Sequence, residues 1–101
     1  MNTLLTPALV IDRAAMERNM AKMNSILEGT SMKLYPHYKS HKCPAIALLQ
    51  MKYGAAGITC AKLGEALDVA EAGVANIVIA NQIVQKEKLP VLAALANRCR
   101  L

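Results

Sequence analysis

Short apolar runs alternate along the chain with longer stretches in which apolar residues return every three or four positions. The runs are compact and bounded by Pro, Gly or polar residues, which is typical of strands. In the longer stretches between the runs, the spacing of three to four residues between apolar positions predicts helices. Strands are expected at 8–11, 32–38, 56–61 and 77–80, and helices between Asp12 and Gly29 and at 44–53, 63–72 and 90–98.

The first expected helix has clear boundary residues and one apolar stripe. Asp12 can accept hydrogen bonds from the unpaired amides of the first turn, and Gly29 is a suitable stop. Apolar residues recur along the helix at spacings of four, three and four, at Met16, Met20, Met23 and Leu27. A stripe at this spacing predicts a buried helix face, and we assign it no functional role.

The order of the expected elements indicates the fold class. Strand and helix alternate strictly, which predicts parallel strands joined by right-handed crossovers. The runs at 56–61 and 77–80 are almost continuously apolar, as in strands that are buried on both faces. A complete β/α barrel needs eight strands and about 250 residues. The three to four βα units of these 101 residues therefore form either a small open α/β domain or a partial (β/α)8 TIM barrel.

Composition narrows the class of protein. The net charge is +5, but the basic residues are scattered and only three Tyr are available for stacking, so neither nucleic acid nor a membrane is an expected partner. Three cysteines without CxxC spacing argue against a disulfide framework and against a zinc knuckle. No signal peptide or membrane-spanning stretch is visible, so a cytoplasmic location is expected.

Reactive side chains are densest at 33–42, KLYPHYKSHK, which holds three Lys and both His of the chain. Alternation along a strand places Tyr35, His37 and Lys39 on one face. Lys39 stands at the carboxyl end of the strand, where β/α barrels carry their active sites. Desolvation and neighbouring positive charge favour the neutral amine, which can attack an aldehyde to form an imine. An ordinary surface lysine at a strand end is the alternative.

Three further polar residues are weaker candidates. His37 and His41 are four residues apart but straddle a strand end, and no acidic residue lies in the segment, so we expect no metal site in this chain. His37 is expected either beside Lys39 in the site or hydrogen-bonded in the core. Asn81, which follows the run at 77–80, is a further candidate for cofactor contact.

The segment 57–73, GITCAKLGEALDVAEAG, carries no recognised nucleotide signature. Neither a dinucleotide fingerprint nor a nucleoside-triphosphate loop occurs in the chain. Cys60 is expected to be a buried strand residue. Lys62 and Glu65, three residues apart at a helix start, are expected to form a minor surface pair.

Three stretches together resemble a known family: LLTPALVIDRAAMERNMAKM, LYPHYKSHKCPAIALLQMKYGAAGITCAKLGEALDVAEAG and NIVIANQIV. They are similar to the N-terminal part of D-threonine aldolases and eukaryotic-type D-serine dehydratases, over almost the whole chain. The family's run Arg-Pro-His-x-Lys-Thr-His-Lys corresponds to 35–42, where Tyr35 replaces Arg and Ser40 replaces Thr. The resemblance implies that Lys39 is the Schiff-base lysine and that Lys42 is not.

The resemblance also implies an alanine-racemase-like barrel, the third fold type of pyridoxal-phosphate enzymes. Residues 1–101 would be its N-terminal part, and the rest of the barrel and a β-rich C-terminal domain would lie outside this chain. The implied cofactor is pyridoxal 5'-phosphate. A divalent metal would be held by the C-terminal part, and the full-length protein would be a homodimer.

The implied activity is that of a lyase that cleaves D-threonine or a related D-β-hydroxy amino acid to glycine and an aldehyde. This activity is expected of the full-length protein, and residues 1–101 alone are expected to be inactive. Three alternatives stay open: a D-serine dehydratase, a pyridoxal-phosphate-binding barrel protein without turnover, and an unliganded α/β fragment.

Overall fold

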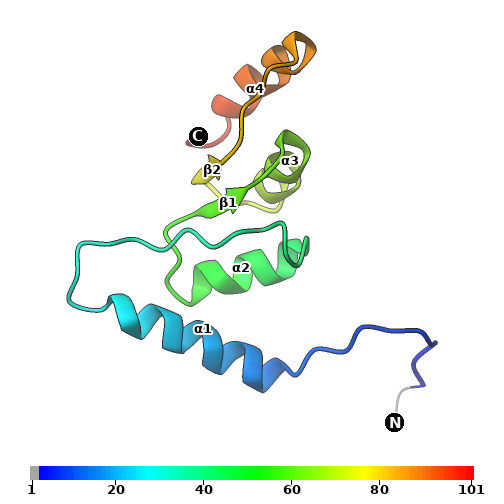
Figure 1. Cartoon of the computed structure of the whole chain (residues 1–101), viewed down its shortest axis with the longest axis vertical. Coiled ribbons are helices and arrows are strands. Elements are labelled where there is room, and N and C mark those ends of the chain that lie inside the picture. Colours follow the sequence, from blue (N-terminus) through cyan, green and yellow to red (C-terminus); the bar gives the residue numbers. More distant parts are fainter. Residues whose placement is uncertain (1–2) are drawn as a thin grey trace.

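The computed structural model describes residues 3–101 as a flat molecule of 48 × 43 × 20 Å. Its elements follow one another along the long axis from α1 to α4 (Figure 1). Their bounds are α1 Arg13–Leu27, α2 Pro44–Lys52, β1 Ile58–Cys60, α3 Leu63–Glu71, β2 Ile77–Ile79, the 3-10 helix η1 Lys86–Lys88, and α4 Leu89–Ala96. None of the described helices is long and apolar enough to cross a bilayer.

A parallel sheet runs through the middle of the chain. β1 and β2 pair in the register Ile58 with Ile77 and Cys60 with Ile79. Single parallel bridges extend the sheet on both sides, from His37 to Thr59 and from Asn76 to Arg100. Four segments therefore lie side by side in sequence order, as successive strands of a β/α barrel do. The predicted partial barrel is confirmed, with an open sheet.

The strand expected at 32–38 is only partly formed. The carbonyls of Leu34 and Pro36 accept hydrogen bonds of 2.8 Å from amides of the 56–59 segment, and the Tyr38 amide donates to the Thr59 carbonyl at 2.8 Å. Pro36 has no N–H and cannot donate to the neighbouring segment in return. The segment therefore lies beside β1 but forms a bridge only at His37.

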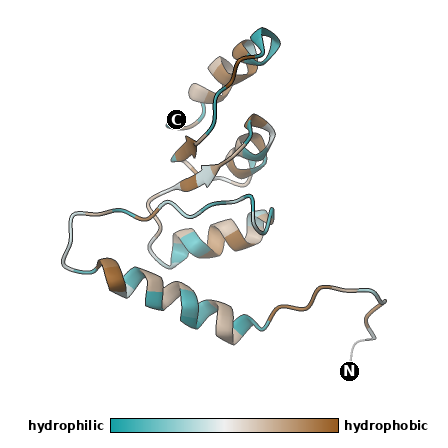
Figure 2. Cartoon of the chain, in the orientation of Figure 1, coloured by the Kyte–Doolittle hydropathy of each residue, from teal (hydrophilic) through white to brown (hydrophobic). Residues whose placement is uncertain are grey.

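The strand expected at 8–11 is wrong. Residues 3–11 extend away from the rest of the molecule (Figure 1), and the apolar side chains along this arm (Figure 2) are exposed, among them Leu9 and Val10. A strand exists only where a second segment pairs with it, and none of the described residues does so here. An apolar run alone is therefore not sufficient to form a strand at 8–11.

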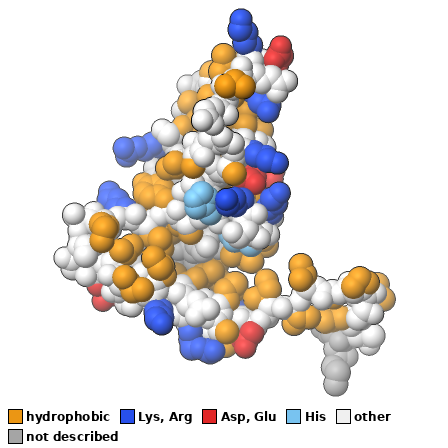
Figure 3. Space-filling view, in the orientation of Figure 1, with side chains coloured by type: hydrophobic (Ala, Val, Ile, Leu, Met, Phe, Trp, Pro, Cys, Tyr) orange, Lys and Arg blue, Asp and Glu red, His pale blue; other side chains and the backbone are white. Residues whose placement is uncertain are grey.

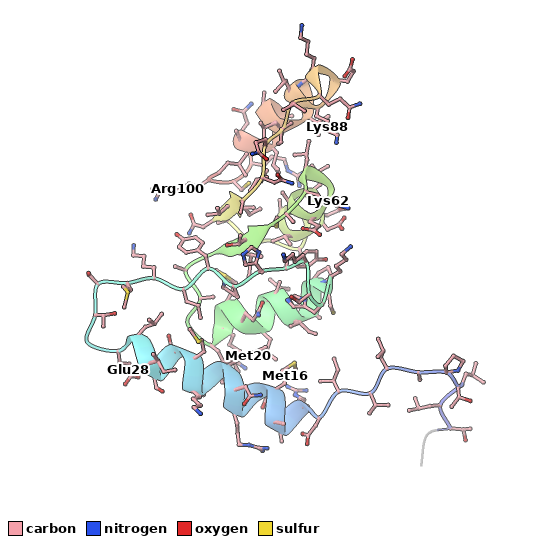
Figure 4. All side chains as sticks on the ribbon, viewed as in Figure 1. Met16, Met20, Glu28, Lys62, Lys88 and Arg100 are labelled. Carbon is pink, nitrogen blue, oxygen red and sulfur yellow. The ribbon has the colours of Figure 1, made fainter. Side chains whose placement is uncertain are left out.

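Helix α1 begins at the predicted residue, but its apolar face is less buried than predicted. The Asp12 carboxylate accepts a 2.9 Å hydrogen bond from the Ala15 amide. Met16 and Met20 point toward α2 (Figure 4) but are only half-buried, and Met23 is exposed. A cavity of about 620 Å³ lies between α1, α2 and residues 34–36, and hydrophobic side chains flank this hollow in Figure 3. The expected burial of the methionine stripe is therefore wrong, because α1 has too few neighbours on that face.

The core lies on one face of the sheet, against α2, α3 and α4. Its fully buried residues include Tyr38, Ala47, Ile58, Cys60, Ala66, Val69, Ile77 and Leu95. On the opposite face Val78 is 42% exposed, so the expectation that 77–80 is buried on both faces is wrong. No described helix covers this open face, which is the side that faces inward in a closed barrel.

Cys60 is fully buried, as predicted, and its environment suppresses its reactivity. Burial, followed by the charges of Glu65 and Asp68, raises the pKa of the Cys60 thiol to about 11. Only the thiolate is nucleophilic, so at pH 8 Cys60 stays protonated. We expect iodoacetamide to label Cys60 about a hundredfold more slowly than Cys43 or Cys99 in the native protein. Peptide mapping before and after denaturation checks this, and equal native rates would contradict it.

Candidate active site

The carboxyl ends of the strands meet at one edge of the sheet. His37, Thr59 and Val78 are aligned across the sheet. The residues two positions later in each segment therefore lie at the same height along the strands. Lys39 follows the first segment, Ala61 follows β1 and Ala80 follows β2, and the Ala80 amide donates to the Cys60 carbonyl at 2.9 Å. Lys39 therefore stands at the edge that carries catalytic residues in β/α barrels.

Lys39 begins a tight turn whose backbone is well fixed. The Tyr38 carbonyl accepts hydrogen bonds from the amides of His41, at 3.2 Å, and Lys42, at 2.9 Å. Lys42 adopts φ 46°, a left-handed conformation that is uncommon outside glycine. The Lys39 side chain is exposed, and no hydrogen bond or ion pair within residues 3–101 engages its amine. The turn thus combines a fixed backbone with an available primary amine.

The open face beside this turn carries the other residues predicted to share it. His37 is exposed and Tyr38 is buried at 1% exposure, so the predicted alternation of faces is correct. Burial is the main cause that raises the pKa of the Tyr38 hydroxyl, which therefore stays neutral. Tyr35 lies over Gly57, where an added Cβ would be 2.4 Å from the Tyr35 ring. The Thr59 hydroxyl donates to the Tyr35 carbonyl at 2.8 Å.

Asn81 lies in a different environment from Lys39. Its side-chain oxygen accepts a 2.9 Å hydrogen bond from the Gln82 amide. It lines a cavity of about 440 Å³ with residues of α3 and of the 82–88 segment, and neither Lys39 nor His37 lines this cavity. His37 and Lys39 lie at one edge of the sheet, and Asn81, which comes two residues after the end of β2, lines a cavity to which neither of them contributes.

Glu65 is a buried carboxylate at the carboxyl edge of the sheet, not the surface residue expected from the sequence. The side chain is 7% exposed, and its carboxylate accepts a 2.7 Å hydrogen bond from the Ala61 amide at the carboxyl end of β1. The expected surface pair with Lys62 is therefore wrong. Glu65 is the third residue of α3 after the N-cap Lys62, the position from which a glutamate reaches back to orphan amides in a capping box. That spacing could have identified it.

His41, for which the sequence suggested no role, is held by two hydrogen-bond partners. Its Nδ1 accepts from the Cys43 amide at 3.1 Å, and its Nε2 lies 3.3 Å from the Gln50 side-chain oxygen. Within residues 3–101 no group of three or more His, Cys, Asp or Glu side chains is arranged to hold a metal ion. Lysine and histidine side chains gather near the middle of the face shown in Figure 3, with acidic side-chain atoms among them.

Residues 11–99 match the sequence profile of the family described as alanine racemase, N-terminal domain. The chain is 43% identical to a D-threonine aldolase from Arthrobacter sp. and 38% identical to a D-threo-3-hydroxyaspartate dehydratase from Delftia sp. strain HT23. Each similarity covers 95% of this chain and 25% of the relative. The chain therefore spans about a quarter of the length of these curated relatives.

Solved structures give the same result for the fold. The crystal structure of D-threonine aldolase from Filomicrobium marinum superposes with a TM-score of 0.91 at 47% sequence identity. The superposition covers 95% of this chain and 26% of that chain. The open sheet and its helices thus match about a quarter of the Filomicrobium marinum chain.

Proposed function

This chain belongs to the alanine racemase N-terminal domain family, and from that premise we propose that it is the first quarter of a pyridoxal-phosphate-dependent lyase. Two open sheet edges, at 34–38 and at Arg100, support the proposal that further strands complete the barrel. The exposed apolar side chains of residues 3–11 and of the open face of β2 also support the proposal, because further parts of the protein would bury them. The whole enzyme would be a homodimer that acts in the cytoplasm on small D-amino acids.

The residues of the chain fit covalent attachment of the cofactor. An exposed lysine amine stands at the carboxyl edge of the sheet, on a backbone fixed by the Tyr38 carbonyl. Pyridoxal phosphate, when bound, supplies a ring that accepts the electrons of the bond broken at the amino acid's α-carbon. Lys39 would hold the cofactor through Nζ and afterwards provide an amine that can carry a proton. His37, exposed on the same face, is the proposed neighbour of this amine, whereas Asn81 would contact the cofactor only from the adjoining cavity.

The open face determines what a substrate would meet. Tyr35 and the Thr59 hydroxyl lie along it, and Tyr35 stands where the family has an arginine, so this position contributes a ring and no charge. With one lysine at a fixed position and one open face, only one enantiomer of an amino acid would be held in the orientation that reacts. A divalent metal, if the enzyme uses one, would be held outside residues 3–101.

We propose aldol cleavage of D-threonine or a related D-β-hydroxy amino acid as the reaction. The observation that carries it is the 43% identity to D-threonine aldolase over 95% of the chain. The second candidate, dehydration of a D-β-hydroxy amino acid, is favoured by the 38% identity to the dehydratase over the same share of the chain. D-Serine is the substrate we propose for that alternative.

Product analysis of the full-length protein with bound cofactor distinguishes the two reactions. We expect glycine and acetaldehyde from D-threonine, and neither from L-threonine, because only one hand of substrate is presented to the cofactor. Glycine, pyruvate and ammonia are measured side by side, with and without a chelator. Pyruvate and ammonia from D-serine without glycine from D-threonine would assign the dehydratase reaction. Absence of every product would favour a binding protein without turnover.

A further inference from the structure

The turn that presents Lys39 is held from two sides by the ring of His41. On one side the ring meets the buried Tyr38 ring edge to face, with centroids 5.3 Å apart and planes at 82°. On the other side its nitrogens contact the Cys43 amide and the side chain of Gln50 in α2. The turn therefore lies between the sheet, through Tyr38, and the first helix that follows it.

The hydrogen bonds of the ring define its protonation. A backbone amide can only donate, so Nδ1, which contacts the Cys43 amide, carries no proton. Nε2 must then carry the ring proton of a neutral imidazole and donate it to the Gln50 oxygen. Both nitrogens of His41 are thus committed to fixing the turn, which leaves neither for a metal or for proton exchange with a substrate.

The turn needs such support because its own backbone is unfavourable. Lys42 holds φ 46°, which residues with a Cβ rarely adopt. The amide after it, that of Cys43, would have no partner in the turn without the His41 ring, since the Tyr38 carbonyl already accepts from His41 and Lys42. The ring therefore supplies the hydrogen bond that closes the turn between Lys39 and α2.

We infer that His41 is a positioning residue for Lys39: its neutral ring joins the Cys43 amide to Gln50 and fixes the direction in which the Lys39 amine leaves the sheet. This inference rests on the proposed role of Lys39 and deepens it. A preset direction lowers the entropy lost when the amine attaches to the cofactor. In this role His41 acts through the turn and needs no contact of its own with cofactor or substrate.

Hydrogen exchange of the full-length protein without cofactor tests the turn directly. His41→Phe keeps a ring against Tyr38 and removes both nitrogens, so the peptide containing Cys43 should exchange about five to ten times faster. His41→Asn keeps an acceptor at the place of Nδ1 and should restore slow exchange. Gln50→Leu removes only the second partner and should give an intermediate rate, and Ser40→Ala, in the same turn, should change nothing.

Binding of pyridoxal phosphate to the same variants tests the consequence for Lys39. The dissociation constant should rise about five- to tenfold in His41→Phe and return toward the original value in His41→Asn. Unchanged exchange in His41→Phe, or no rescue by asparagine, would overturn the inference. If His41→Phe does not fold, slow exchange in His41→Asn with faster exchange in Gln50→Leu supports it, and the reverse order overturns it. Failure of the proposed function would instead appear as no cofactor binding by the unsubstituted protein.

Discussion

Replacing Lys39 with alanine should abolish covalent attachment of pyridoxal phosphate to the full-length protein, together with the absorption band of the attached cofactor. The physical reason is that Lys39 offers an exposed amine at the carboxyl edge of the sheet, where neighbouring strand ends are aligned with it. The expected effect is complete, because Lys39 stands at the carboxyl edge of the sheet, whereas Lys33, which alternation places on the same face, lies at the opposite end of the segment.

Lys42→Ala is the matched control for this experiment. Lys42 lies in the same turn, is exposed and carries the same kind of side chain, but it stands at the far end of the turn, where its own amide donates to the Tyr38 carbonyl. The absorption band should be retained in this variant. Loss of the band in Lys42→Ala with retention in Lys39→Ala would contradict the assignment of the cofactor lysine.

Gly57→Ala should be the most damaging small substitution in the sheet. An added Cβ would lie 2.4 Å from the Tyr35 ring and 2.5 Å from the Asn76 carbonyl oxygen. The ring could move, but the carbonyl belongs to the backbone that accepts from Ile58, at 3.0 Å. Overpacking of this kind should lower the free energy of unfolding by about 1–3 kcal/mol, measured by urea denaturation of the full-length protein.

Gly64→Ala is the control for the loss of a glycine. Gly64 lies in α3, and an added Cβ would have nothing within 4 Å. Alanine is a better helix former than glycine, so this substitution should leave stability unchanged or raise it by up to about 1 kcal/mol. Equal destabilisation by the two substitutions would show that the close approach of Tyr35 and Asn76 to Gly57 is not what requires glycine there.

Local sequence signals were sufficient to predict the helices and the order of helices and strands along the chain. Asp12 caps α1 as expected, and the expected helices at 44–53 and 63–72 begin and end near Pro44, Gly54 and Gly73, where such residues start or stop a helix. Both glycines have positive φ, near 105°, so their positions follow from backbone sterics rather than from packing. Such signals act over a few residues and need no knowledge of the rest of the molecule.

The incorrect predictions concern surfaces whose neighbours cannot be read from local pattern. The methionine stripe of α1 and the apolar run at 8–11 indicate that these residues are suited to burial, but burial needs a second surface. Val78 is likewise an apolar residue suited to burial, but it is exposed in the structure. The missing neighbours of all three are consistent with a chain that spans a quarter of its relatives.

In the candidate site, too, some features follow from local sequence pattern and others depend on tertiary structure. Alternation along the 35–39 segment was enough to put Lys39 and His37 on one side and Tyr38 on the other. The roles of Glu65 and His41 depend on hydrogen bonds to amides that are fixed only when strand, turn and helix are assembled. Residue type and spacing were therefore enough to propose Lys39 as the reactive amine, and the tertiary structure was needed to find the hydrogen bonds that Glu65 and His41 accept.

Borohydride reduction of the full-length protein with bound pyridoxal phosphate, followed by peptide mapping, tests the central claim most directly. Reduction makes the link between lysine and cofactor permanent, so the modified peptide identifies the lysine without any substitution. Lys39, the residue directly after Tyr38, should be the single modified site. Modification of Lys42 or Lys62 instead of Lys39 would contradict it.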